Sequence, residues 1–130
     1  MARMRNHVNG SFLAALGVAG AIACSSASSA PSPSTAAATI TISNNAVSPK
    51  NVSVPRGSQV AFVNNDNTTH NMASDPHPEH TDCPEINQVG SLGPGQTKLT
   101  GNMTTNRAVC GFHDHNAPDV VGLQGSITIQ

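Results

Sequence analysis

Short segments in which apolar and polar residues alternate, separated by turn-forming residues, constrain the fold of this chain more than any other feature. Threonine alternates with isoleucine in residues 39–42, and residues 47–54 and 126–130 show the same alternation. A period of two places every second side chain on the same face of a half-buried strand. No segment outside the N-terminus keeps the period of an amphipathic helix. The sequence therefore predicts an all-β fold.

Turn and loop signals divide the remainder of the chain into further short strands. Residues 55–57 and 93–95 combine glycine with proline or arginine and predict turns. We expect additional strands at residues 59–64 and 108–113, and a long polar loop with three prolines at residues 74–87. About seven short strands at this spacing favour a β-sandwich.

The composition limits the chain to one small domain and excludes several classes of protein. The chain has 130 residues, of which 10% are charged, and a net charge of −1, so no basic surface indicates nucleic-acid binding. Neither a serine nucleophile motif nor a glycine-rich phosphate loop is present in the sequence. We therefore expect a binding protein and not an enzyme.

The N-terminus has the pattern of an export signal. Arg3 and Arg5 precede an apolar run at residues 12–23, which has the length of a signal-peptide core and is too short to span a bilayer. We therefore predict that residues 1–23 are a signal peptide and that the mature protein is exported to the periplasm or the cell surface, where disulfides can form.

Cys24 follows small residues and precedes a serine-rich segment, which resembles a bacterial lipoprotein signal. Lipidation of Cys24 would attach the protein to a membrane, whereas ordinary cleavage after Ala23 would release it. Residues 24–38 consist almost entirely of serine, alanine, proline and threonine, so we predict a tether without a core of its own. The folded domain is then expected at residues 39–130.

Histidines are concentrated in the second half of the chain. Of the six, one lies in the predicted signal peptide. The other five are His70, His77, His80, His113 and His115. Neutral imidazole is the commonest metal ligand in proteins, so this concentration indicates a metal site.

Cys110 and His113 are three positions apart near the end of a predicted strand, and their thiolate and imidazole could converge on one ion. His70, expected at the end of another strand, could supply a third ligand. Two nitrogens and one sulfur in a trigonal arrangement form a blue-copper site. These three residues are therefore candidate copper ligands.

Several motifs in this order resemble the cupredoxins, the family of plastocyanin and pseudoazurin, over roughly residues 39–130. The motifs are Val47-Ser48-Pro49, Val52-Ser53-Val54-Pro55-Arg56-Gly57, Val60-Ala61-Phe62-Val63-Asn64-Asn65-Asp66, His70, Leu92-Gly93-Pro94-Gly95-Gln96, Cys110-Gly111-Phe112-His113 and Leu123-Gln124-Gly125-Ser126-Ile127-Thr128-Ile129. The resemblance implies a cupredoxin-like Greek-key β-sandwich with a mononuclear copper site formed by His70, Cys110 and His113. It also implies electron transfer with a redox partner protein.

The sequence departs from the family at the axial ligand. The family's methionine is replaced by Leu123, which cannot bind a metal. Met72 lies two residues after His70 and is either an alternative axial donor or a core residue, since methionine commonly fills gaps in cores.

Because of Cys83, Cys110 has a second possible role, as a partner in a disulfide. The two cysteines that remain after export can form a disulfide, which would remove the thiolate ligand. Such a disulfide closes a loop of about 28 residues and would stabilise the domain by about 3–4 kcal/mol. Both interpretations of Cys110 remain open from the sequence.

If the disulfide forms, a histidine site still remains. Side chains alternate along a strand, so His113 and His115 lie on one side and Asp114, expected to be a solvated acid, points away. Together with His70 and His80 they could hold Cu(II) or Zn(II), with copper favoured by the affinity series. In this alternative the protein handles copper, with a copper-donor protein as partner, and transfers no electrons.

Overall fold

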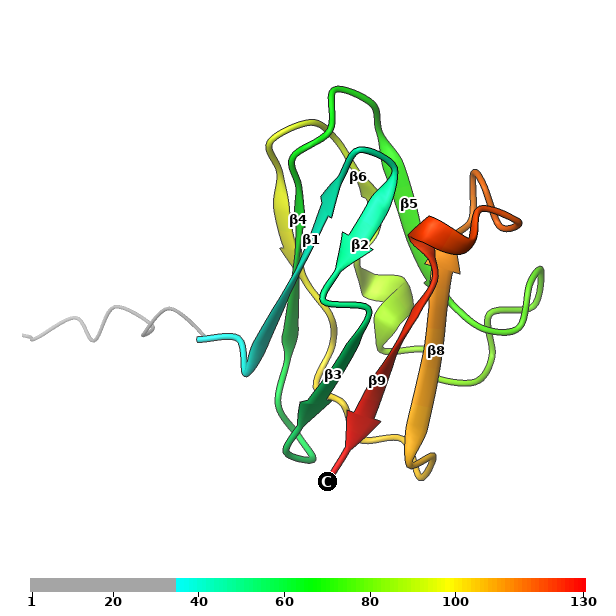
Figure 1. Cartoon of the computed structure of the whole chain (residues 1–130). Helices are drawn as coiled ribbons and strands as arrows, with labels where there is room; N and C mark the ends of the chain where they lie inside the picture. Colours follow the sequence, from blue (N-terminus) through cyan, green and yellow to red (C-terminus); the bar gives the residue numbers. More distant parts are fainter. Residues whose placement is uncertain (1–34) are drawn as a thin grey trace, which may run out of the picture. The chain divides into compact units, whose positions relative to one another are not determined.

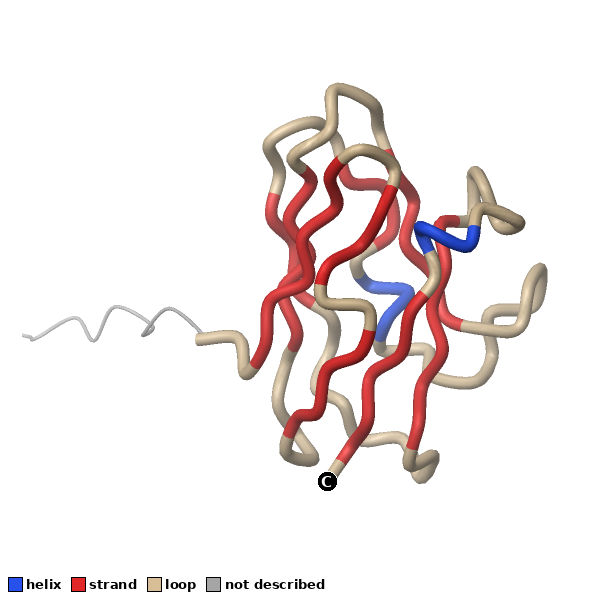
Figure 2. Tube along the Cα trace, viewed as in Figure 1, coloured by secondary structure: helices blue, strands red, loops and turns tan. Residues whose placement is uncertain are grey.

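The computed structural model describes residues 35–130, which form two β-sheets packed face to face (Figures 1 and 2). One sheet has the strand order β2 (Ala46–Ser48), β1 (Ala38–Ser43), β4 (Val60–Asn64) and β7 (Thr97–Leu99). The other has the order β3 (Asn51–Val54), β9 (Gly125–Ile129), β8 (Val109–Asp114), β5 (His70–Ser74) and β6 (Gly90–Leu92). Two short 3-10 helices, η1 (Ile86–Gln88) and η2 (Val121–Leu123), lie in the connections. The predicted all-β sandwich is confirmed.

The strand predicted at residues 47–54 is in fact two strands that belong to different sheets. Ser48 of β2 pairs with Thr41 of β1 in the first sheet, whereas Asn51 of β3 pairs with Ser126 of β9 in the second. Pro49 separates them and has no N–H to donate to a ladder, so the chain leaves one sheet there and enters the other. Alternation of apolar residues continues across the break, which is why the pattern predicted one strand.

Nine strands are observed in residues 35–130, where about seven were expected. The strands β6 and β7 have three residues each, too few for a detectable alternation. Ser74, expected in the loop, is the last residue of β5, and that loop ends in η1. The predicted strands at residues 59–64, 108–113 and 126–130 correspond to β4, β8 and β9 within one or two residues.

The core lies between the sheets and consists largely of aliphatic side chains. The rings of Phe62 and Phe112 meet edge to face in this core, with ring centroids 5.2 Å apart. Met72, Cys83 and Cys110 are also fully buried in this core. Every second residue of β8 faces it, so Cys110 and Phe112 point inward while Gly111 and His113 are on the opposite face of the sheet.

The predicted signal peptide, Cys24 and most of the predicted tether lie outside the described residues. The first described strand, β1, begins at Ala38. Among residues 35–130, no helix has the length and apolar character needed to cross a membrane.

Candidate metal centre

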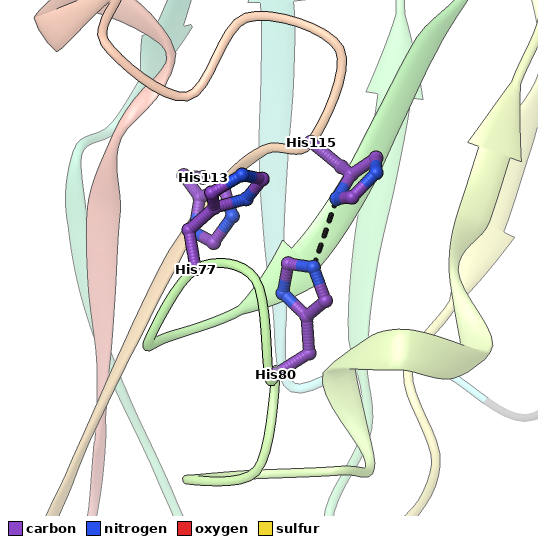
Figure 3. Close-up of side chains that lie close together, drawn as sticks. All are labelled: His77, His80, His113 and His115. Atoms are coloured by element: carbon purple, nitrogen blue, oxygen red, sulfur yellow. Dashed lines mark hydrogen bonds between the residues drawn. The ribbon is translucent and has the colours of Figure 1, made fainter.

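Four histidines meet at one site on the surface of the five-stranded sheet (Figure 3). They are His77, His80, His113 and His115, and one potential ligand atom from each lies within 4.8 Å of those of the others. Nitrogens bound to one ion at about 2.0–2.1 Å are at most about 4 Å apart, so small side-chain rotations would bring all four onto one ion. The four imidazoles therefore fit a transition-metal ion.

Two of these histidines come from the end of β8. His113 pairs in register with Ala73 of β5, and the backbone N–H of His115 donates to the carbonyl of Asn71, 2.7 Å away. Both side chains are on the outer face, as the alternation predicted. The intervening Asp114 points inward, also as predicted, but it is buried and not solvated, so that part of the prediction is wrong.

The other two histidines come from the loop between β5 and η1, which lies beside β8 (Figure 1). His80 has a φ of 54°, a left-handed conformation that is costly for a residue with a Cβ. Three hydrogen bonds hold it there: its N–H donates to Pro76 O at 2.7 Å, its carbonyl accepts from Asn87 at 2.8 Å, and its ring contacts Ser74 O. The loop is thus shaped to present His80.

A disulfide between Cys83 and Cys110 ties this loop to β8. The sulfur of Cys110 is therefore not available as a thiolate, and the prediction that Cys110 is a copper ligand is wrong. Geometry also separates Cys110 from His113: because β8 continues to Asp114, residues three apart on it point to opposite faces. The alternative prediction, a Cys83–Cys110 disulfide, is the one that the structure shows.

His70 is not part of the four-histidine cluster and contacts two carboxylates instead. Its Nδ1 is 2.7 Å from Oδ2 of Asp114, and its Nε2 is 3.0 Å from Oδ2 of Asp66. Asp114 also accepts hydrogen bonds from the backbone N–H groups of Asn71 and Asn116. The predicted ligand set of His70, Cys110 and His113 is thus corrected, since only His113 lies at the cluster.

Asp66 connects His70 to the turn after β1. Burial raises the pKa of Asp66, but hydrogen bonds from the N–H groups of Asn45 and Asn44 and from His70 outweigh it, so the pKa is lowered overall. The carboxylate form of Asp66 is therefore stabilised by the fold. His70 and its two acids form a structural network.

The two other residues considered as axial positions are core residues. Met72 is fully buried and pairs with Asp114, on the face of β5 that points away from the cluster. Leu123 is also buried in the core. Met72 therefore packs in the core, and the structure does not bring it to the four histidines.

The ring nitrogens of the cluster are oriented by polar groups on the adjoining backbone and side chains. Nδ1 of His80 is 2.8 Å from the carbonyl of Ser74, and Nδ1 of His113 is 2.7 Å from Oδ1 of Asp75. Nε2 of His80 is 2.8 Å from Nδ1 of His115 (Figure 3). Nε2 of His113 is buried and has no hydrogen-bond partner, a costly state that a metal ion would relieve.

A cleft of about 750 Å³ adjoins the cluster. His77, His113 and Asp75 are among its lining residues, as are Lys50 and Asp119. His77 and His115 are exposed and His80 is half-buried, so an ion at the cluster would be reachable from solvent.

His77 is the member of the cluster that sequence reasoning missed as a ligand. The available signal was its spacing: His77 and His80 are three residues apart in one loop, and His113 and His115 are two apart at the end of a strand. Two such pairs can supply four imidazoles to one ion, provided that the fold brings the loop to the strand.

No protein-family model matches the sequence, and a comparison with curated proteins finds no match. Solved structures do resemble it. A purple cupredoxin from Nitrosopumilus maritimus has a TM-score of 0.53 and 20% identity, over 72% of this chain and 99% of that chain. Amicyanin from Paracoccus versutus has a TM-score of 0.56 and 17% identity, over 77% and 86%.

A third solved structure, an amicyanin variant in a reduced Cu(I) form, has a TM-score of 0.53 and 13% identity, over 72% of this chain and 82% of that chain. At these identities the likeness concerns the arrangement of the strands, which agrees with the two-sheet topology described above. The chain therefore has a cupredoxin-like β-sandwich fold.

Proposed function

We propose that this chain is a copper-binding protein that holds Cu(II) in the four-histidine cluster. The observation that carries this proposal is the convergence of four imidazoles within 4.8 Å, one of which buries an unpartnered Nε2. Imidazole nitrogens without thiolate form the donor set that suits Cu(II).

Copper is favoured over other divalent metals on two grounds. Nitrogen sites bind copper more tightly than zinc or nickel by the general affinity order of these ions. The solved structures of the same fold include an amicyanin described in a Cu(I) form. We infer that the present site differs from theirs in its ligands, because Cys110 is in a disulfide.

The proposed role is copper handling, meaning capture and exchange of the ion with a copper-donor protein. His77 and His115 are exposed, so an incoming ligand from a partner could reach an ion bound there. Exchange of this kind requires no change in oxidation state, and it requires no thiolate.

Electron transfer through the same copper ion is a second candidate. The observation that favours it is the existence of a reduced Cu(I) form in a structure of this fold. A reversible one-electron couple in protein-film voltammetry would support electron transfer with a redox partner. Loss of copper on reduction would support handling instead.

We also propose that the protein acts outside the cytoplasm. The buried Cys83–Cys110 disulfide supports this location, because disulfides persist in oxidising compartments. The predicted signal peptide at residues 1–23 and a lipid on Cys24 would place the domain in the periplasm or at the cell surface. Mass spectrometry of the mature N-terminus tests the lipid, and an unmodified terminus would exclude it.

Competition titration with a chelator tests the copper site directly. The variant His80→Ala/His115→Ala removes two of the four nitrogens, and we expect its Cu(II) affinity to fall at least about 100-fold. His70→Gln is the control, because His70 is a histidine outside the cluster, and its affinity should be unchanged in the folded protein. Undiminished affinity of the double variant would refute the proposed site.

A further inference from the structure

We propose that Asp75 is a positioning residue that holds His113 with Nε2 free for the metal. We also propose that glycine at position 111 leaves the space in which the Asp75 carboxylate makes this contact. This inference rests on the proposed copper site and adds to it residues that are not ligands themselves.

The contact between Asp75 and His113 determines which ring nitrogen carries hydrogen. Oδ1 of Asp75 is 2.7 Å from Nδ1 of His113, and a carboxylate can only accept. The hydrogen of the neutral ring is therefore on Nδ1, and the lone pair is on Nε2. That Nε2 is the buried atom without a partner, so the carboxylate orients it for a metal ion.

Gly111 provides the room for this contact. A Cβ at position 111 would lie 2.0 Å from Oδ2 of Asp75 and 2.9 Å from its Cγ, both closer than atoms can approach. Gly111 lies within β8 and its φ is not in the left-handed region, so backbone conformation does not require glycine there. The space taken by the carboxylate is the reason that the structure gives for glycine at this position.

Two backbone hydrogen bonds hold Asp75 in place. The N–H of Asp75 donates to the carbonyl of Gly111 at 3.0 Å, and its own carbonyl accepts from Asp82 at 2.9 Å. The preceding residue, Ser74, directs its carbonyl at Nδ1 of His80. Two adjacent residues thus set two rings of the cluster: Nε2 of His113 has no partner, and Nε2 of His80 lies 2.8 Å from Nδ1 of His115, inside the cluster.

Nuclear magnetic resonance of the metal-free chain tests the inference without any copper. In two-bond ¹⁵N–¹H spectra, His113 of the wild-type chain should be the Nδ1–H tautomer. In Asp75→Ala we expect a mixture of tautomers, together with a Cu(II) affinity lowered about 10–100-fold. Asp119→Ala is the matched control, since Asp119 lines the same cleft, and both properties should remain those of the wild type.

Gly111→Ala is the second test, because it keeps the carboxylate but displaces it. We expect the same change of tautomer, and we expect Asp75→Ala/Gly111→Ala to bind copper no more weakly than Asp75→Ala alone. Gly93→Ala is the control: a Cβ there would lie 3.3 Å from the flexible end of Gln96. Dispersed amide spectra verify that each variant is folded, and Asp75→Leu, which also lacks an acceptor oxygen, replaces Asp75→Ala if that variant unfolds.

The outcomes separate this inference from the proposed function. An unchanged His113 tautomer in folded Asp75 and Gly111 variants would overturn the positioning role, even if copper binds. A wild-type chain that binds no Cu(II) would overturn the proposed function, while the tautomer measurement would still decide whether Asp75 orients the ring.

Discussion

His70 occupies the position where the resemblance to cupredoxins implied a copper ligand, but its two ring nitrogens contact Asp114 and Asp66. Each of the two ring nitrogens thus lies at hydrogen-bond distance from a carboxylate oxygen, and neither faces the four-histidine cluster. His70 and Asp114 are almost completely buried, so neither can exchange its partner for water. At this residue the fold has a buried hydrogen-bond network where a metal ligand was expected.

Replacing His70 should therefore destabilise the fold without weakening copper binding. In His70→Gln the two acids lose a hydrogen-bonding partner, and we expect the free energy of unfolding to fall by about 1–3 kcal/mol. Urea denaturation measures this loss, and titration under native conditions measures the affinity for Cu(II). A large loss of Cu(II) affinity in the folded variant would instead indicate that His70 is a ligand.

Asp66 gives the network an acid dependence with a defined sign. Its folded-state pKa lies below its ordinary value of 3.8, so its contribution to stability is fully present above that value and is lost as the pH falls through the lower, folded pKa. We expect Asp66→Asn to have a flatter loss of stability than the wild type between about pH 5 and pH 2. Urea midpoints measured across this range test the expectation, and parallel curves would contradict it.

These contacts of His70 could not be predicted from the sequence. Its partner Asp114 is 44 positions away, and pairing the two requires the register of β5 on β8. Alternation alone did predict that His113 and His115 share a face. It also implies that Cys110 and His113 lie on opposite faces if the strand continues past Cys110, but the end of the strand was not evident from the residues.

At the scale of elements, the loop between β5 and η1 and the strand β8 form the site together. The disulfide joins them at Cys83 and Cys110, which are 27 positions apart, and so holds His77 and His80 against His113. The sequence showed that this pairing was possible. The sequence could not show whether Cys110 is a copper ligand or a disulfide partner, because the answer depends on the direction in which its sulfur points.

Removing the disulfide should affect both stability and copper binding. In Cys83→Ala/Cys110→Ala the unfolded chain gains the freedom of the open loop, and we expect a loss of about 3–4 kcal/mol of stability. We also expect weaker Cu(II) binding, because the loop that carries two of the ligands is held less firmly. Denaturation and chelator competition measure these effects, and undiminished affinity would mean that the disulfide does not support the site.

At the scale of the whole molecule, the two-sheet sandwich carries a set of candidate ligands different from the set that the resemblance to cupredoxins implied. Turn signals and alternation were sufficient to predict the sandwich, since one face of each strand must be buried. They were not sufficient to locate the site, which depends on a long loop folding onto the outer face of β8 and β5. We therefore place the candidate copper site on the surface of the sheet, whereas Cys110 and His70 point toward its inner side.

The visible absorption spectrum of the chain after addition of Cu(II) tests this account most directly. We predict stoichiometric binding with only weak d–d absorption, because the proposed ligands are four imidazoles and the sulfurs of Cys83 and Cys110 are in a disulfide. An intense sulfur-to-copper charge-transfer band that persists in Cys24→Ser would contradict the account, since it would require a free thiolate at Cys83 or Cys110 that binds the copper ion.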